Sequence, residues 1–265
     1  MVNDLKEHFG RSEQQACTLV DISRSSYRYR PRPPTDSELR QRLKELAEQK
    51  KRYGARRLHI LVKKEGLVVN HKRTERIYRE EHLALRRKVR KKLPSGLRAP
   101  LPQPAAPNEQ WAIDFIHDMT STSRRFRCLT VLDLYTRECL AIRVDTSISG
   151  KAVIDTLQRQ LELRGIPRTI VLDNGPEFTS NVFQSWAAGK AIHLAYIRPG
   201  KPMDNAFIES FQGKCRDECL NQHWFTSLPE ARQIIEQWRE EYNHERPHSS
   251  LSDLTPIEFA ERATA

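Results

Sequence analysis

Residues 110–117 read Gln110-Trp-Ala-Ile-Asp-Phe-Ile-His117, a run of β-forming residues that contains one acid in its middle. Apolar and polar side chains partly alternate along this run, as they do in a strand that is buried on one face. Asp114 is an isolated charge among apolar neighbours, which is unfavourable unless the charge is paired or holds a cation. The stretch therefore predicts a strand that carries a functional acid.

The sequence after this strand predicts an α/β domain. Two further β-rich segments follow, at 126–134 and 138–144. Helical and strand patterns then alternate, with helices at 151–164, 178–188, 204–221 and 228–242 and strands at 168–173 and 191–197. Three successive strands followed by such alternation indicate a mixed sheet flanked by helices.

The composition points to a polyanionic partner. The 265 residues include 45 Lys and Arg against 34 Asp and Glu, which gives a net charge of +11. No stretch approaches the roughly 18 consecutive apolar residues of a membrane span, and the N-terminus has no signal-peptide core. The five cysteines show no Cys-x-x-Cys pair, so neither a disulfide framework nor a structural zinc site is expected. Membrane, secreted and fibrous proteins are excluded, and a cytoplasmic location is expected.

The charge is divided unequally between two parts of the chain. Residues 1–107 carry 27 Lys and Arg against 12 Asp and Glu, a net of +15. Residues 108–265 carry 18 basic and 22 acidic residues, a net of −4. This asymmetry predicts a nucleic-acid-binding front joined to a part with a different task.

Proline-rich stretches predict the domain boundaries. We expect an N-terminal helical segment at 1–34, a helix-turn-helix DNA-binding domain at 35–92, a proline-rich linker at 93–108 and a catalytic core at 109–265. In the second domain, Thr35-Asp-Ser-Glu38 fits a capping box, and a third helix over 71–81 has a basic face. A helical bundle with solvent-facing basic residues is the alternative. The candidate DNA contacts are Lys72, Arg73, Arg76 and Arg79, followed by the basic block of Arg86, Arg87, Lys88, Arg90, Lys91 and Lys92.

Three acids are the candidate catalytic and metal-binding residues. Asp114 lies in the first strand, Asp173 ends the strand at 168–173, and Glu209 lies in the helix at 204–221. Oxygen ligands without His or Cys suit Mg²⁺ or Mn²⁺, and two such ions can assist phosphodiester displacement. Arg216, on the same helix face as Glu209, could meet a phosphate, and Lys214 is a further candidate contact.

Each acid also has a structural interpretation. Asp173 could only cap the Asn174-Gly175 turn, and Asp114 could face water from an edge strand. Glu209 could pair with Lys214 or Arg216 on an exposed helix face.

The spacing of these acids resembles a known catalytic core. Asp173 and Glu209 are separated by 35 residues, as in the DD(35)E core of retroviral integrases and bacterial insertion-sequence transposases. Three local strings resemble the second-reading-frame transposases of the IS3 family: Asp173-Asn-Gly-Pro-Glu-Phe178, Pro202-Met-Asp-Asn-Ala-Phe-Ile-Glu-Ser-Phe211 and Tyr242-Asn-His-Glu-Arg-Pro-His-Ser-Ser-Leu251.

This resemblance implies a ribonuclease-H-like core and a Mg²⁺-dependent transposase that cleaves DNA at insertion-sequence ends and transfers strands. It implies double-stranded DNA as partner, both terminal inverted repeats and target, with a homo-oligomer assembled on it. The upstream reading-frame product, or a frameshift fusion with it, is a further implied partner. The competing hypotheses are a non-catalytic DNA-binding regulator and a nuclease of the same fold that does not join strands.

Two features are left open or assigned to packing by the sequence. His244 and His248 could touch DNA or the active site, or their segment could pack the last long helix on the core. Trp186 and Trp224 are expected to be core residues.

Overall fold

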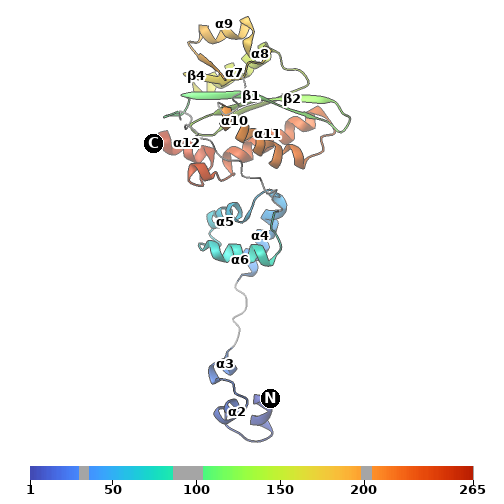
Figure 1. Ribbon diagram of the computed structural model, residues 1–265, viewed down its shortest axis with the longest axis vertical. Coiled ribbons are helices and arrows are strands. Elements are labelled where there is room, and N and C mark those ends of the chain that lie inside the picture. The colour runs from blue at the N-terminus through green and yellow to red at the C-terminus, as the bar shows by residue number, and fades with distance from the viewer. Residues whose placement is uncertain (30–35, 86–103, 198–204, 265) are drawn as a thin grey trace, which may run out of the picture.

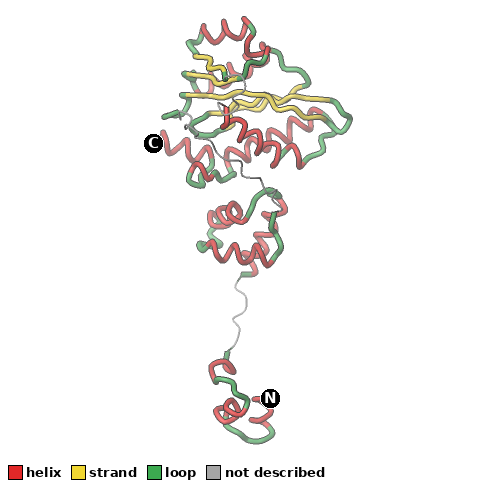
Figure 2. Tube along the Cα trace, viewed as in Figure 1, coloured by secondary structure: helices red, strands yellow, loops and turns green. Residues whose placement is uncertain are grey.

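The computed structural model describes residues 1–29, 36–85, 104–197 and 205–264 (Figure 1). Figure 2 marks its helices, strands and loops by colour. The basic block at 86–92 and most of the predicted linker at 93–108 lie outside the described residues. Within the described ranges, no helix is both long and apolar enough to cross a membrane.

The first three helices form a small cluster of their own. They are α1 (Val2–Glu7), α2 (Glu13–Leu19) and α3 (Arg24–Arg28). Ala16 and Cys17 of α2 are buried at the centre of this cluster. Ser12 begins α2 with a capping box, because its hydroxyl accepts from the Gln15 N–H while the Gln15 side chain accepts from the Ser12 N–H.

The next three helices have a second, separate core. They are α4 (Ser37–Gln49), α5 (Ala55–Lys64) and α6 (His71–Glu80). Leu43, Leu58 and Ile77, one from each helix, are fully buried against one another. Asn70 caps α6 through its side chain, which accepts from the Lys72 N–H. The apolar spacing therefore produces the three helices that the sequence predicts.

The sheet of the third part is mixed, as predicted. Its strands are β1 (Gln110–Met119), β2 (Arg125–Asp133), β3 (Cys139–Asp145), β4 (Thr169–Leu172) and β5 (His193–Tyr196). They are arranged in the order β3-β2-β1-β4-β5. The pairs β1–β2 and β2–β3 are antiparallel, whereas β1–β4 and β4–β5 are parallel. β1 is therefore the central strand.

Helices cover both faces of this sheet (Figure 1). The face that carries Trp111 and Ile113 packs against α7 (Gly150–Arg164), α8 (Pro176–Thr179) and α9 (Asn181–Gly189). The face that carries Ala112 and Ile116 packs against α10 (Ala206–Glu218) and α11 (Leu228–His244). The short helices η2 (Leu220–Gln222) and η3 (Ser249–Leu251) and the helix α12 (Pro256–Thr264) complete the described chain.

One of the two tryptophan predictions is wrong. Trp186 packs partly buried against the second cluster of core residues. Trp224 is 81% exposed, because it lies in the turn between η2 and α11, where its neighbour Phe225 takes the buried position.

The helix-turn-helix domain, here the helices α4–α6, contacts the core through ion pairs. Its basic residues meet acids of α10, α11, α12 and the preceding loop. The pairs are Lys50–Glu241 at 2.6 Å, Arg52–Asp217 at 2.7 Å, Arg56–Asp253 at 3.0 Å, Arg57–Glu218 at 2.8 Å and Lys64–Glu258 at 2.5 Å. Part of the opposite charge on the two halves of the chain is therefore used to hold them together.

Candidate active site

The register of two parallel strands brings the two candidate aspartates together. Residue 110 pairs with 169, 111 with 170 and 112 with 171. The same offset, continued past the end of β4, sets Asp114 beside Asp173. Neighbouring strands are about 4.8 Å apart, so two carboxylates in this register are close neighbours.

Both aspartates belong to the face of the sheet that α10 covers. Side chains alternate along a strand, so Asp114 shares its face with Ala112, and Asp173 shares its face with Val171. Ala112 and Val171 both pack in the core cluster that contains α10. Glu209 lies in the first turn of α10, beside Ile208, which anchors this helix to the sheet. Three separate elements therefore carry acids at this end of the sheet, with Glu209 exposed on α10 and near enough to act on the charge of Asp114.

Burial and nearby negative charge both act on Asp114. Its pKa is raised to about 6 by burial, with the charges of Asp173 and Glu209 adding to the shift. The N–H of Phe115, 2.7 Å from the Asp114 Oδ1, and the Gln212 side chain act in the opposite direction. A carboxylate in such surroundings is stabilised by a bound cation.

The structure rejects two of the structural interpretations of these acids. Asp114 does not lie on an edge strand, because β1 is flanked by β2 and β4. Among the described residues Glu209 has no ion pair with Lys214 or Arg216. The capping role of Asp173 is real, since its Oδ1 accepts from the Gly175 N–H at 2.9 Å. That bond occupies one oxygen and orients the carboxylate.

Gly175 is needed for this orientation. A Cβ built on Gly175 would lie 2.9 Å from the Asp173 Oδ1, closer than a carbon and an oxygen pack. The atom that must move is the end of a side chain, so the fold can adapt while the carboxylate is displaced.

We expect Gly175→Ala to leave the melting temperature nearly unchanged and to lower the rate of any metal-dependent reaction at these acids by about 10²-fold, an effect that a misplacement near 1 Å can have. Gly189→Ala is the matched control, because nothing lies within 4 Å of its Cβ position. Equal reaction rates in the two variants would contradict this role.

An ion pair stabilises the turn that follows Asp173, and it was not predicted from the sequence. Arg127 of β2 pairs with Glu177 at 2.5 Å, and its guanidinium lies 3.9 Å from the centre of the Phe115 ring. Phe115 stacks on Phe178. The residues next to Asp114 and those after Asp173 are thereby joined. In the sequence, the only sign of this contact was Glu177, the second acid of Asp173-Asn-Gly-Pro-Glu-Phe178.

The chemistry of the donors fits a hard divalent cation, since all three side chains are carboxylates. Within the described part of the chain, no group of three His, Cys, Asp or Glu side chains is already close enough to hold an ion.

The candidate DNA contacts on α6 are used in different ways. Lys72 is exposed, and so is Arg79, whose Nε donates to the Glu75 carbonyl at 3.3 Å. Arg73 and Arg76 both pair with Asp36. Asp36 precedes α4 and its side chain makes no capping hydrogen bond, while Thr35, the first residue of the predicted capping box, lies outside the described residues. DNA contact by these residues stays a prediction.

The candidates on α10 point to two different places. The Nη2 of Arg216 donates to the carbonyl of His117 in β1 at 2.9 Å and leaves the rest of the exposed guanidinium available. Lys214 instead lines a cavity between α10 and the helix-turn-helix domain.

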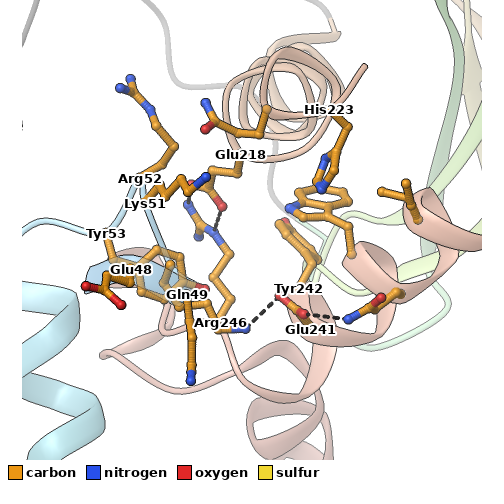
Figure 3. A pocket seen from close by; sticks show the side chains of 15 residues that line it. Glu48, Gln49, Lys51, Arg52, Tyr53, Glu218, His223, Glu241, Tyr242 and Arg246 are labelled. Carbon is orange, nitrogen blue, oxygen red and sulfur yellow. Dashed lines mark hydrogen bonds and ion pairs between the residues drawn. The ribbon is translucent and has the colours of Figure 1, made fainter. Parts of the chain in front are cut away.

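Residues 242–251 pack the end of α11 on the core, which is one of the two interpretations that the sequence left open. The Asn243 side chain exchanges hydrogen bonds with the backbone N–H and carbonyl of Cys139, each at 2.9 Å. Arg246 donates twice to Glu218 at 2.7 Å, and Arg52 and Tyr53 of the helix-turn-helix domain line the adjoining cavity (Figure 3). His248 is buried against Tyr242, whereas His244 is exposed and near Glu240.

Comparison with known families agrees with this architecture. Residues 34–92 match the family model of the HTH-like domain. Residues 104–202 and 190–256 match two family models of the Integrase core domain. The chain resembles solved retroviral proteins in fold. It matches a chain of the simian T-cell lymphotropic virus intasome with a TM-score of 0.55 at 17% identity, over 82% of this chain and 74% of that one. It matches the HTLV-2 integrase catalytic core domain, solved with magnesium, with a TM-score of 0.50 at 19% identity, over 59% and 98%.

Full-length relatives come from bacterial insertion elements. The chain is 49% identical to an uncharacterized 31.7 kDa protein of insertion element IS407 from Burkholderia multivorans, over 98% of this chain and 95% of that protein. It is 25% identical to the putative transposase InsK of insertion sequence element IS150 from Escherichia coli, over 98% and 96%. With its helix-turn-helix domain, its mixed five-stranded integrase core and this level of identity, the chain belongs to the IS3 family of insertion-sequence transposases, within the DDE polynucleotidyl transferases.

Proposed function

We propose that this chain cleaves DNA at the ends of an insertion sequence and joins the freed ends to target DNA, with Asp114, Asp173 and Glu209 as the catalytic residues. The observation that carries the proposal is the placement of three acids on β1, the end of β4 and α10, where the charges of Asp173 and Glu209 add to the burial that raises the pKa of Asp114. Such a site is repulsive until positive charge enters it.

The three carboxylates would hold Mg²⁺ or Mn²⁺, and two ions is the number we propose. When bound, the metal would stabilise charge on the attacking and leaving oxygens of the phosphodiester. The protein's own residues orient the reactants: the Gly175 N–H positions Asp173, and Arg216 offers a cation to the phosphate, seven residues beyond Glu209. In cleavage a water oxygen attacks phosphorus and the 3′ oxygen leaves. In joining, the freed 3′-hydroxyl attacks a phosphorus of the target strand, and the target's own 3′ oxygen leaves.

We further propose that residues 1–92 bind the terminal inverted repeats and that the active form is a homo-oligomer assembled on two DNA ends in the bacterial cytoplasm. The HTH-like domain at 34–92 supports the first proposal, and the likeness to an intasome chain suggests the second. The product of an upstream reading frame, or a fusion with it, remains a proposed partner.

The proposal can be tested with the full chain, Mg²⁺ and three DNA substrates. A duplex that continues past the terminal repeat tests cleavage. A precut repeat with a 3′-hydroxyl tests joining to a target duplex, and the same repeat with a 3′-deoxy end is the control. We expect the protein to cleave the first substrate. Of the two precut repeats, we expect it to join only the one with a 3′-hydroxyl. Cleavage without joining would indicate a nuclease, and binding without cleavage would indicate a DNA-binding regulator.

A further inference from the structure

A cavity of about 390 Å³ lies between the helix-turn-helix domain and the core. One wall carries Arg52, Arg56 and Arg57, from the start of α5 and the residues before it, and the opposite wall carries Lys214, Arg246 and His248. The hydroxyl-bearing residues Ser249 and Ser250 are also part of its lining. Asp217, Glu218 and Asp253 line the cavity as well, so its five Lys and Arg side chains exceed its acids by two.

Most of these cations already have an acidic partner. Arg52 pairs with Asp217 and Arg56 with Asp253, while Glu218 serves both Arg57 and Arg246. Lys214 differs, because within the described ranges no carboxylate lies within ion-pair distance of its Nζ. A half-buried ammonium without a counter-charge is an unfavourable arrangement unless an anion reaches it.

Burial and neighbouring positive charges both lower the pKa of two groups in the lining. Burial, together with the charges of Arg246, Arg57 and Arg137, lowers the pKa of Lys214 to about 8, and the nearby Glu218 only partly offsets this. Burial also holds the pKa of His248 far below its ordinary value, and Arg246, Lys214 and Arg57 lower it further. An anion in the cavity would relieve this repulsion.

We propose that this cavity binds a backbone phosphate of the transposon-end DNA, with Lys214 as its principal contact. The proposal rests on the DNA transposase function proposed above and adds a contact outside the catalytic site. A DNA strand is favoured over a free small anion because the cavity joins the DNA-binding domain to the catalytic helix. Lys214 follows Glu209 by five residues, about 7.5 Å along the axis of α10 and about 140° around it, so the DNA contact at Lys214 lies on a different side of the helix from the catalytic site.

The salt dependence of DNA binding by Lys214→Met tests this contact. Affinity is measured for a terminal-repeat duplex and an unrelated duplex between about 50 and 200 mM salt, with no divalent metal present. Loss of one phosphate contact should reduce the slope of log K against log salt by about 0.9 for both duplexes. Lys151→Met, which removes an exposed lysine of α7, is the control with the same change of net charge and should keep the wild-type slope.

This test has two controls, which are the stability of the variants and a second substitution at Lys214. Because Lys214→Met removes an unpaired charge, its melting temperature should not fall, and Lys214→Arg should keep the wild-type slope. A wild-type slope in Lys214→Met would overturn the proposal. The proposal would also be overturned if the two slopes were equal and inorganic phosphate raised the melting temperature of the wild type but not that of Lys214→Met. That result would indicate a site for free phosphate. DNA binding without metal does not depend on cleavage, so failure of the proposed chemistry would be seen separately.

Discussion

Replacing Asp173 by Asn is expected to reduce metal-dependent cleavage and joining by at least about 10³-fold, because the stabilisation that a carboxylate-bound metal supplies amounts to several kcal/mol. Asn keeps an oxygen that can accept from the Gly175 N–H, which the Asp173 Oδ1 now does. The turn should therefore persist while the charge is lost. Asp114→Asn and Glu209→Gln should have effects of the same size.

DNA binding and folding should survive these substitutions. Asp114 is a half-buried acid whose pKa is raised by burial and by neighbouring negative charges, so its neutral replacement removes repulsion. We expect the melting temperature of Asp114→Asn to be equal to or above that of the wild type. Affinity for the terminal-repeat duplex without metal should be unchanged.

The matched control is Asp155→Asn, which removes an exposed acid on α7, away from α10. It should cleave and join at the wild-type rate. Full activity in all three active-site variants would refute the assignment, whereas loss of DNA binding together with cleavage would point to misfolding.

Replacing Glu218 by Gln is expected to lower the free energy of unfolding by about 3–5 kcal/mol, because it leaves a buried charge without its partner. The Glu218 carboxylate accepts two hydrogen bonds from Arg246 at 2.7 Å and one from Arg57 at 2.8 Å. The Arg246 side chain is only 3% exposed, so water cannot replace the lost charge. Urea unfolding at neutral pH measures the effect.

Two further variants show whether the buried charge is the cause. In Glu218→Gln with Arg246→Met, both partners are neutral, and much of the lost stability should return. Glu240→Gln removes an acid whose side chain is 50% exposed, and it should change stability by no more than about 1 kcal/mol. A loss in the double variant as large as in Glu218→Gln would contradict this explanation.

The pH dependence of the same pair has a definite sign. Burial alone would raise the pKa of Glu218, but the hydrogen bonds and charges of Arg246 and Arg57 outweigh it, and the net pKa is lowered. A carboxyl with a lowered folded pKa contributes stability that is complete above its ordinary value of 4.5 and is lost as pH falls through the folded pKa. The stability difference between wild type and Glu218→Gln should therefore shrink below about pH 4.5.

Glu218 and Glu209 occupy the two ends of one helix. α10 presents Glu209 to the catalytic site from its first turn and receives Arg57 of the helix-turn-helix domain at its last. Weakening the Glu218 contacts should therefore also reduce cleavage, and the cavity beside Lys214 should be disturbed at the same time. A Glu218→Gln protein that is destabilised but cleaves at the wild-type rate would show that the two ends are independent.

The elements of the core and the identity of the acids could be predicted from the sequence. Apolar spacing along 151–164 and β-forming runs such as 126–134 predict α7 and β2, because these patterns record which side of a local element is buried. Asp114 stood out as a charge inside an apolar strand. Resemblance to a known core then united it with Asp173 and Glu209.

The turn at Asp173 shows where local reasoning was incomplete. Asn174-Gly175 indicated a turn with Asp173 as its cap, which the structure contains. That interpretation was offered as an alternative to a catalytic role, yet one carboxylate oxygen can serve the turn while the other faces the site. Only the parallel pairing of β4 with β1 shows that this acid lies beside Asp114.

The sequence by itself determined the order of helices and strands, the uneven charge and the three acids, because each depends on residues near one another in the chain or on their total number. The tertiary structure decided how the charges are used. Arg57 meets Glu218 across 161 residues, and Arg73 and Arg76 are drawn to Asp36. Such pairs depend on which faces come together, and local periodicity does not encode this. For the same reason only the structure could show that Lys214, among so many basic residues, faces a cavity without an acidic partner in the described chain.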